Sequence, residues 1–273
     1  MLKTRIITAI VMLAILVPAL FWMPQLGWAV FVAVVAGVGG WEWAGFMRLT
    51  PRQRVFAGVG LTAICLALLL VLPEMFGVAS STSLRLALPL YLVAGGFWLL
   101  LVPFWLHCKW RLPTGVLGLL IGLVLILPAW AALVQLRLLG AWQLLAIMAF
   151  VWVADCAAYL FGRLFGRHKL AINISPGKTW EGAIGAALAV LVYGLVMRPV
   201  FKLDAPDLGF WIIGLSALTA LSIVGDLFES LLKRQVGLKD SSNVLPGHGG
   251  VLDRIDSLTS TLPVLMFIYL LFL

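Results

Sequence analysis

The chain has 273 residues, of which 63% are hydrophobic and 11% are charged, against roughly 45–50% and about 25% in ordinary soluble domains. With a mean hydropathy of +1.11, it carries more apolar surface than the interior of a soluble domain of this size can bury. This composition excludes a conventional soluble enzyme and a disordered chain. The three cysteines form no CxxC pair, which also argues against a disulfide scaffold. We therefore expect a polytopic membrane protein.

Nine apolar runs are long enough to cross a bilayer, which takes about 20 residues of helix. We expect them at residues 5–23, 26–47, 55–73, 84–106, 114–135, 141–161, 180–199, 209–228 and 257–273. Lys3 and Arg5 precede the first run as in a signal peptide, but that run has no A-x-A site and another follows at once. We expect an uncleaved first helix and an all-α polytopic integral membrane fold.

The basic residues are distributed unevenly between the two sides of this predicted bundle. With the N-terminus in the cytoplasm, 15 of the 19 Lys and Arg residues lie on the cytoplasmic side. The four on the other side are Arg85, Arg137, Arg198 and Lys202. The positive-inside rule therefore predicts a cytoplasmic N-terminus and an outer, periplasmic C-terminus in the inner membrane. The formal net charge of +8 then reflects orientation and contact with anionic lipid, and no nucleic-acid partner is needed.

Polar residues are concentrated in the second half of the chain. Residues 1–140 read as a scaffold of transmembrane helices, with lipid access and dimer contact both open as roles. Residues 141–273 read as the catalytic region, with cytoplasmic loops at 162–181 and 229–257. Because an independent soluble domain needs at least ~50 residues, these loops predict a site at the boundary between membrane and cytoplasm. A homodimer stays open.

Two carboxylates lie inside or at the edge of apolar runs. Asp155 and Asp226 would each cost about 2.5–3.5 kcal/mol at mid-span if ionised and unpaired. A metal site or an ion relay would explain them, and an internal salt bridge to Arg163 or Arg167 is the alternative for Asp155. Glu42 is similar, and the sequence leaves its role open.

A second acidic pair, Asp253 and Asp256, has the i, i+3 spacing that places both on one helix face. They repel each other there unless a cation lies near them. Asp226 and Glu229 repeat this spacing, and clustered carboxylates suit Mg²⁺. The alternative is an ordinary acidic helix start.

Two loop segments could contact phosphate. In PGHGG at 246–250, the glycines let backbone amides face an anion ahead of the next helix; a plain tight turn is the alternative. SPGKTWEG at 175–182 contains GKT, but a P-loop would need glycine where Ile172 stands. Lys178 and Thr179 remain as phosphate contacts at a helix start.

The 27 residues from Ser230 to Asp256, SLLKRQVGLKDSSNVLPGHGGVLDRID, resemble the signature of phosphatidate cytidylyltransferases, also called CDP-diacylglycerol synthases. Gly225-Asp226, the segment DCAAYLFGRLFGRHKL and SPGKTWEG are also similar to that family, so the likeness covers about 151–257. Gly177 departs from it, since relatives often carry a second lysine there. The resemblance implies that CTP and phosphatidate give CDP-diacylglycerol and pyrophosphate in phospholipid biosynthesis, with Mg²⁺ as cofactor and membrane lipid as surroundings.

This resemblance assigns roles to residues of this chain. We expect the metal ligands to be Asp226, Asp253 and Asp256. We expect the catalytic residues to be Asp226, Lys233, Arg234, Lys239, Asp253 and Arg254. We expect the substrate-binding residues to be Lys178, Thr179, Ser230, Asp240, His248, Gly249 and Gly250.

Two other functions stay open as alternatives. A CTP-dependent polyprenol kinase would share the nucleotide and the topology. A cation-coupled secondary transporter would use Asp155 and Asp226, although transporters usually show related halves with paired broken helices. A CDP-alcohol phosphotransferase is disfavoured, because its DGxxAR motif needs a DG dipeptide and the chain has none.

Overall fold

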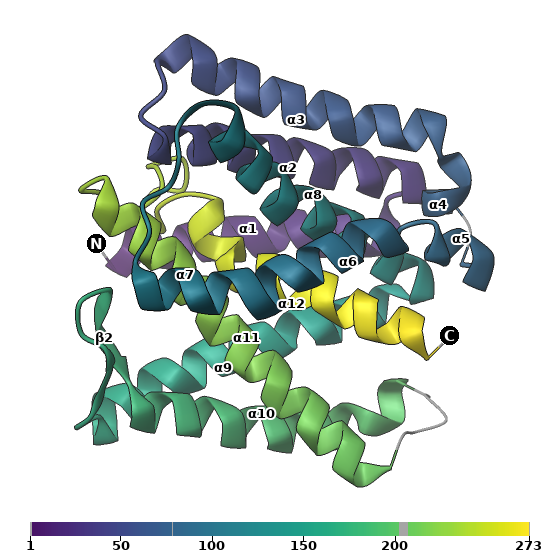
Figure 1. Ribbon diagram of the computed structural model, residues 1–273. Helices are drawn as coiled ribbons and strands as arrows, with labels where there is room; N and C mark the ends of the chain where they lie inside the picture. The colour runs from purple at the N-terminus through teal and green to yellow at the C-terminus, as the bar shows by residue number, and fades with distance from the viewer. Residues whose placement is uncertain (1, 78, 202–206, 273) are drawn as a thin grey trace.

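The computed structural model describes residues 2–77, 79–201 and 207–272. The described residues form twelve α-helices, one π-helical segment and two strands (Figure 1). In chain order they are α1 (Leu2–Trp22), α2 (Gln25–Phe46), α3 (Pro51–Val71), α4 (Pro73–Gly77), α5 (Ser81–Arg85), α6 (Leu88–Gly96), η1 (Phe97–Leu101), α7 (Val102–Cys108), α8 (Gly115–Leu139), α9 (Ala141–Phe165), β1 (Lys169–Ala171), β2 (Ser175–Thr179), α10 (Trp180–Phe201), α11 (Leu208–Gln235) and α12 (Leu252–Leu271).

Within the described residues, nine helical segments are long and apolar enough to cross a membrane, and α6, η1 and α7 together make one of them. The predicted helical membrane fold is confirmed. It is supplemented by one hairpin, in which β1 and β2 pair antiparallel with Lys169 opposite Thr179. Pro176, which lacks a backbone N–H, lies within this hairpin.

Two helices extend further than hydropathy predicts. α11 continues to Gln235 and α12 begins at Leu252, so the loop expected at 229–257 is confined to 236–251. The extra turns contain Glu229, Lys233 and Asp253, which are buried and joined by ion pairs. Because paired charges can be buried within a helix, the fall in hydropathy does not mark its end.

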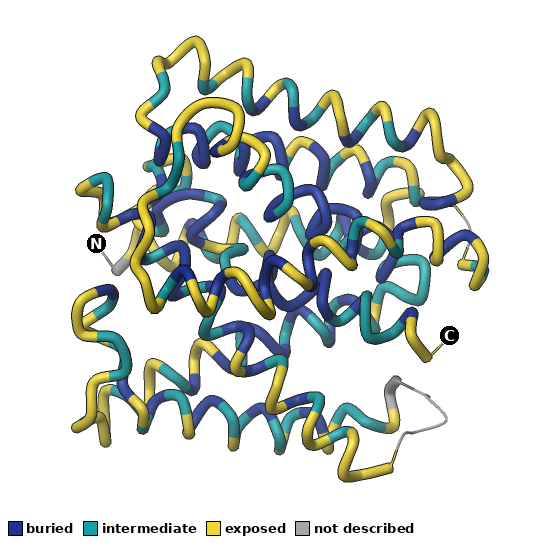
Figure 2. Tube along the Cα trace, in the orientation of Figure 1, coloured by how far each residue is buried: buried dark blue, intermediate teal, exposed yellow. Residues whose placement is uncertain are grey.

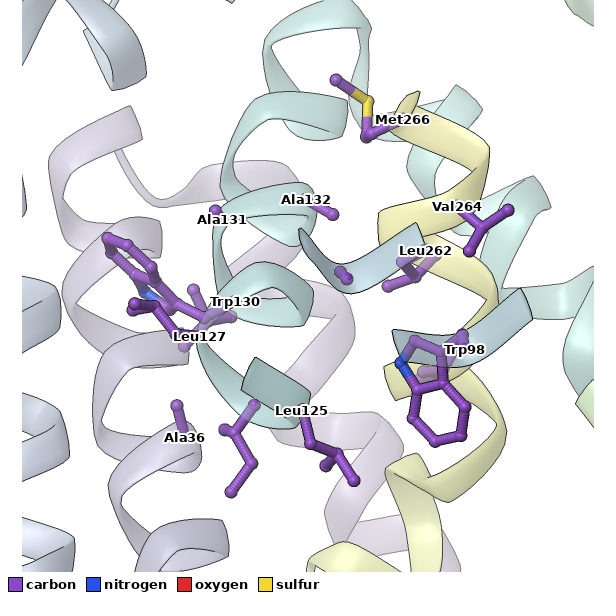
Figure 3. Close-up of a cluster of buried hydrophobic side chains, with 14 of the residues drawn as sticks. Ala36, Trp98, Leu125, Leu127, Trp130, Ala131, Ala132, Leu262, Val264 and Met266 are labelled. Atoms are coloured by element: carbon purple, nitrogen blue, oxygen red, sulfur yellow. The ribbon is translucent and has the colours of Figure 1, made fainter. Parts of the chain in front are cut away.

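The core lies where α2, α8 and α12 meet in the middle of the bundle. Trp130 and Leu125 of α8, Leu262 of α12 and Trp98 of η1 are buried there (Figure 3). Outer helices such as α3 and α10 are largely exposed along their outward sides (Figure 2). Many of these exposed side chains are apolar, Phe56 among them, as a helix facing acyl chains requires.

The connecting loops gather at two opposite ends of the bundle. At one end Thr8 Oγ1 donates to the carbonyl of Pro246 at 2.7 Å, and Gln235 Nε2 donates to that of Trp110 at 2.7 Å. The N-terminus and β2 lie at this end, and the C-terminus lies at the other (Figure 1). The signature loop 236–251 therefore shares its end of the molecule with the hairpin and the start of α1.

Candidate active site

A cavity of 480 Å³ lies between α9, α10, α11, α12 and the β2 strand. Its described charged lining residues are Asp155, Lys178, Asp226, Lys233, Asp240, Asp253, Arg254 and Asp256. The sequence predicts seven of these eight as site residues, and for Asp155 it leaves a metal site, an ion relay and an internal salt bridge open. The structure therefore brings charged residues from five segments to one cavity, namely α9, β2, α11, the loop at 236–251 and α12.

The pair Lys178–Asp226 joins the hairpin to α11 across the cavity wall. Lys178 Nζ lies 2.6 Å from Asp226 Oδ2, with both side chains partly exposed. Ser230, one turn further along α11, donates to Asp226 Oδ1 at 3.3 Å. This pair places one cation and one carboxylate in the wall of the cavity.

Lys233 and Asp253 form a buried pair in the inner wall of the cavity. Lys233 Nζ lies 2.5 Å from Asp253 Oδ1 and 3.3 Å from Glu229 Oε1. Asp253 Oδ2 accepts three more hydrogen bonds, from Ser241 N at 2.7 Å, Gly250 N at 2.8 Å and Ser241 Oγ at 2.9 Å. Both oxygens of Asp253 are therefore engaged by the protein itself.

The amides at the end of the glycine-rich turn and just after it donate to protein carboxylates. Gly250 N donates to Asp253, while the amides of Val251 and Leu252 donate to Glu42 at 2.9 and 2.6 Å. Gly249 has φ +83°, and a Cβ there would lie 2.6 Å from Asp253 Oδ2. The glycines thus permit close approach to carboxylates, and sequence spacing gave no sign of the partner Glu42.

His248 lies in the same turn and is half-buried, outside the cavity lining. Its backbone N–H donates to the carbonyl of Leu245 at 2.8 Å. Burial lowers the pKa of the imidazole, and the nearby Arg254 and Arg5 lower it further. The neutral ring is therefore favoured, which weakens the expectation that His248 contacts phosphate as a cation.

Four other predicted residues lie at or beyond the margin of the cavity. Arg234 is exposed and donates to the carbonyl of Leu238 at 3.2 Å; neither it nor the exposed Lys239 lines the cavity. Thr179 does line it, with its hydroxyl accepting from Gly182 N at 3.1 Å as the cap of α10. Ser230 reaches the site through Asp226.

The charge of the wall bears on what the cavity can bind. Five carboxylates and three basic side chains line it, so the described wall has a formal charge of −2 when all are ionised. Among the described residues, no group of three or more His, Cys, Asp or Glu side chains is arranged to hold a metal ion. The wall therefore has hard oxygen donors without a complete metal cage of its own.

Comparisons with known proteins show which family the chain belongs to. Residues 3–272 match the model of the Cytidylyltransferase family. The chain is 42% identical over 269 residues to a phosphatidate cytidylyltransferase of Pseudomonas aeruginosa, covering 97% of this chain and 95% of that protein. A phosphatidate cytidylyltransferase of Haemophilus influenzae is 36% identical over 286 residues, which cover 98% of this chain and 99% of that protein. A phosphatidate cytidylyltransferase of Brucella suis is 35% identical over 274 residues, which cover 97% of this chain and 92% of that protein. The chain belongs to the cytidylyltransferase family of nucleotidyltransferases.

Proposed function

We propose that this protein transfers the cytidylyl group of CTP to phosphatidate, giving CDP-diacylglycerol and pyrophosphate. The observation that carries this proposal is a charged cavity of 480 Å³ built into a bundle of membrane-spanning helices. A lipid phosphate can enter such a cavity while its acyl chains stay in the bilayer. The names of the relatives from three organisms support the same reaction.

The chemistry needs little acid–base help from the protein. A phosphomonoester has a second pKa near ~6, so at neutral pH the lipid phosphate already has an anionic oxygen that can attack the α-phosphorus. The new O–P bond forms as the bond to the pyrophosphate oxygen breaks, and pyrophosphate leaves with the electron pair. Reactions of this type are catalysed mainly by positioning and by charge neutralisation.

The side chains of the cavity would supply part of that neutralisation. Lys178 and Arg254 face the cavity and would contact the phosphates of the two substrates. Lys233, held between Asp253 and Glu229, would keep the inner wall in place. Arg234 and Lys239 would act outside the cavity, on phosphate that approaches from solvent.

Magnesium remains part of the proposal, with a revised set of ligands. Mg²⁺ is commonly held by one or two carboxylates together with substrate phosphates and water, so a complete protein cage is not required. Asp226 and Asp256 line the cavity and fit this role, whereas the predicted third ligand Asp253 has both oxygens engaged. When bound, the ion would neutralise phosphate charge and stabilise the leaving pyrophosphate.

The protein is a multi-pass membrane protein, and we place the cavity on the cytoplasmic side of the inner membrane. This placement is supported by the basic residues of the loops, most of which belong to the end that carries the cavity. A phosphatase that works only outside the cytoplasm, fused after residue 273, should be active. A homodimer is compatible with the many exposed apolar side chains, which fit lipid equally well.

The test uses the full chain purified in detergent and CTP labelled at the α-phosphorus. With phosphatidate and Mg²⁺, we expect the label to move into the lipid phase. Label that stays in water would refute the proposal. With a prenol acceptor, transfer of a γ-phosphorus label would instead indicate a polyprenol kinase, and solute accumulation in proteoliposomes without nucleotide would indicate a transporter.

A further inference from the structure

Glu42 is a fully buried acidic side chain in the half of the chain that lacks the signature. It lies on α2 and is 0% exposed. Residues 1–140 contain one other acidic residue, Glu74, which is exposed. Burying a carboxylate is costly unless hydrogen bonds satisfy it, so its partners indicate what it does.

All four described partners of Glu42 lie in the signature segment. Its Oε1 accepts from Ser242 Oγ at 2.6 Å and from Val251 N at 2.9 Å. Its Oε2 accepts from Leu252 N at 2.6 Å and from Ser241 Oγ at 3.2 Å. Val251 is the N-cap of α12 and Leu252 is its first residue, where amides have no partner within the helix. Glu42 therefore caps α12 from a different helix and joins the middle of the preceding loop to its end.

Ser241 connects Glu42 to the cavity. Its hydroxyl, which has a single proton to donate, lies between Glu42 Oε2 and Asp253 Oδ2 at 3.2 and 2.9 Å. Asp253 in turn binds Lys233, and both line the cavity, whereas Glu42 does not. A chain of polar contacts thus runs from α2 to the inner wall of the site.

Gly250 shows how closely these groups are packed. A Cβ at this position would lie 2.0 Å from Ser241 Oγ and 2.3 Å from Glu42 Oε1. Only glycine fits between the two without displacing one of them. Glu42 and Asp253 therefore both contact the loop close to Gly250.

We propose that Glu42 is a positioning residue for the site. By fixing loop 236–251 to the start of α12, it sets Asp253 and Arg254 in their places on the cavity wall. It touches neither substrate itself. This inference rests on the proposed function, because its consequence is measured on cytidylyl transfer.

Glutamine cannot replace Glu42, although it has the same length. Each carboxylate oxygen accepts one backbone N–H, from Val251 or from Leu252. Either orientation of a glutamine amide would therefore direct its NH₂ group at a backbone donor. Aspartate is one methylene shorter but keeps two acceptor oxygens. The expected order of kcat is wild type, then Glu42→Asp, then Glu42→Gln.

The experiment measures kcat, KM and hydrogen exchange on the full chain in detergent. Because small displacements of catalytic groups can cost about 100-fold in rate, we expect Glu42→Gln to lower kcat about 10–100-fold with little change in the KM for CTP. In Glu42→Gln, amide hydrogen exchange should become faster in the peptide covering 239–252 and stay unchanged in the peptide covering 109–114. The matched control Glu74→Gln should change neither measurement.

A double-mutant cycle separates positioning from general destabilisation. If Glu42 acts through Ser241, the loss of kcat in Ser241→Ala should be smaller in the Glu42→Gln background than in the wild type. A kcat within twofold of wild type in Glu42→Gln, or faster exchange along the whole chain, would overturn the inference. Lack of transfer by the wild type would refute the proposed function, whereas local exchange at 239–252 would still report on the Glu42 contacts.

Discussion

The buried pair Lys233–Asp253 gives the most direct test of how the site is held together. We consider Asp253→Asn, which keeps the shape of the side chain and removes its charge. The single side-chain oxygen of asparagine could still accept from Ser241 N and Gly250 N. In the wild type these atoms lie 2.7 and 2.8 Å from Asp253 Oδ2. The NH₂ group of the asparagine would then face Lys233 Nζ, which in the wild type lies 2.5 Å from Asp253 Oδ1.

Removing one partner of a buried ion pair typically costs about 3–5 kcal/mol, because the other charge stays buried without full compensation. Glu229 Oε1, at 3.3 Å from Lys233 Nζ, offers some compensation, so we expect about 3 kcal/mol, the lower end of that range. Asp253→Asn should therefore lose stability as well as activity.

The assay is unfolding by denaturant in mixed micelles, followed by tryptophan fluorescence. Asp207→Asn is the matched control, because Asp207 is exposed and caps α11, and asparagine caps as well as aspartate. The double variant Lys233→Met/Asp253→Asn should lose less than the sum of the two single variants. An unfolding free energy for Asp253→Asn equal to that of the control would refute this account of the inner wall.

Three further outcomes are expected. Asp226→Asn should lower kcat by about 10²–10³-fold through lost electrostatic stabilisation. The free energy of unfolding should stay within about 1 kcal/mol of wild type, because the Asp226 side chain is 34% exposed. Activity equal to that of the wild type would contradict a role for Asp226 in catalysis. Gly250→Ala should lose both stability and activity, because the new Cβ would lie 2.0 Å from Ser241 Oγ. Gly60→Ala is the control and should be tolerated, because a Cβ there would have nothing within 4 Å. Similar behaviour of the two variants in thermal unfolding and in cytidylyl transfer would be evidence against tight packing at Gly250. Chelating divalent cations should reduce transfer of the CTP label to background and added Mg²⁺ should restore it, while transfer that persists with chelator would exclude the magnesium proposal.

The membrane fold could be read from the sequence because a spanning helix leaves a long apolar run. The ends of α11 and α12 could not be read in the same way. Glu229, Lys233 and Asp253 continue these helices while carrying charge, and hydropathy cannot tell a buried ion pair from a loop. The β1–β2 hairpin also escaped prediction, since β1 has three residues and β2 has five.

Helical spacing explains which of the predicted residues on α11 line the cavity. Asp226 and Lys233 are seven residues apart on α11, which is nearly two turns, so they share a face and both line the cavity. Arg234 is one residue further, so it points about 100° away and is exposed outside the lining. Lys239 lies beyond the end of the helix, where spacing along α11 no longer predicts direction.

The partners of the signature loop could not be found from spacing, because they come from distant parts of the chain. Glu42 lies 199 to 210 residues from the groups that donate to it. Thr8 of α1 holds the carbonyl of Pro246, and the carbonyl of Trp110 accepts from Gln235. Polar content divides the chain at about residue 140, but these contacts cross that division. The helices that read as scaffold therefore hold the loop that carries the site, and a substitution among them can change catalysis without touching the cavity.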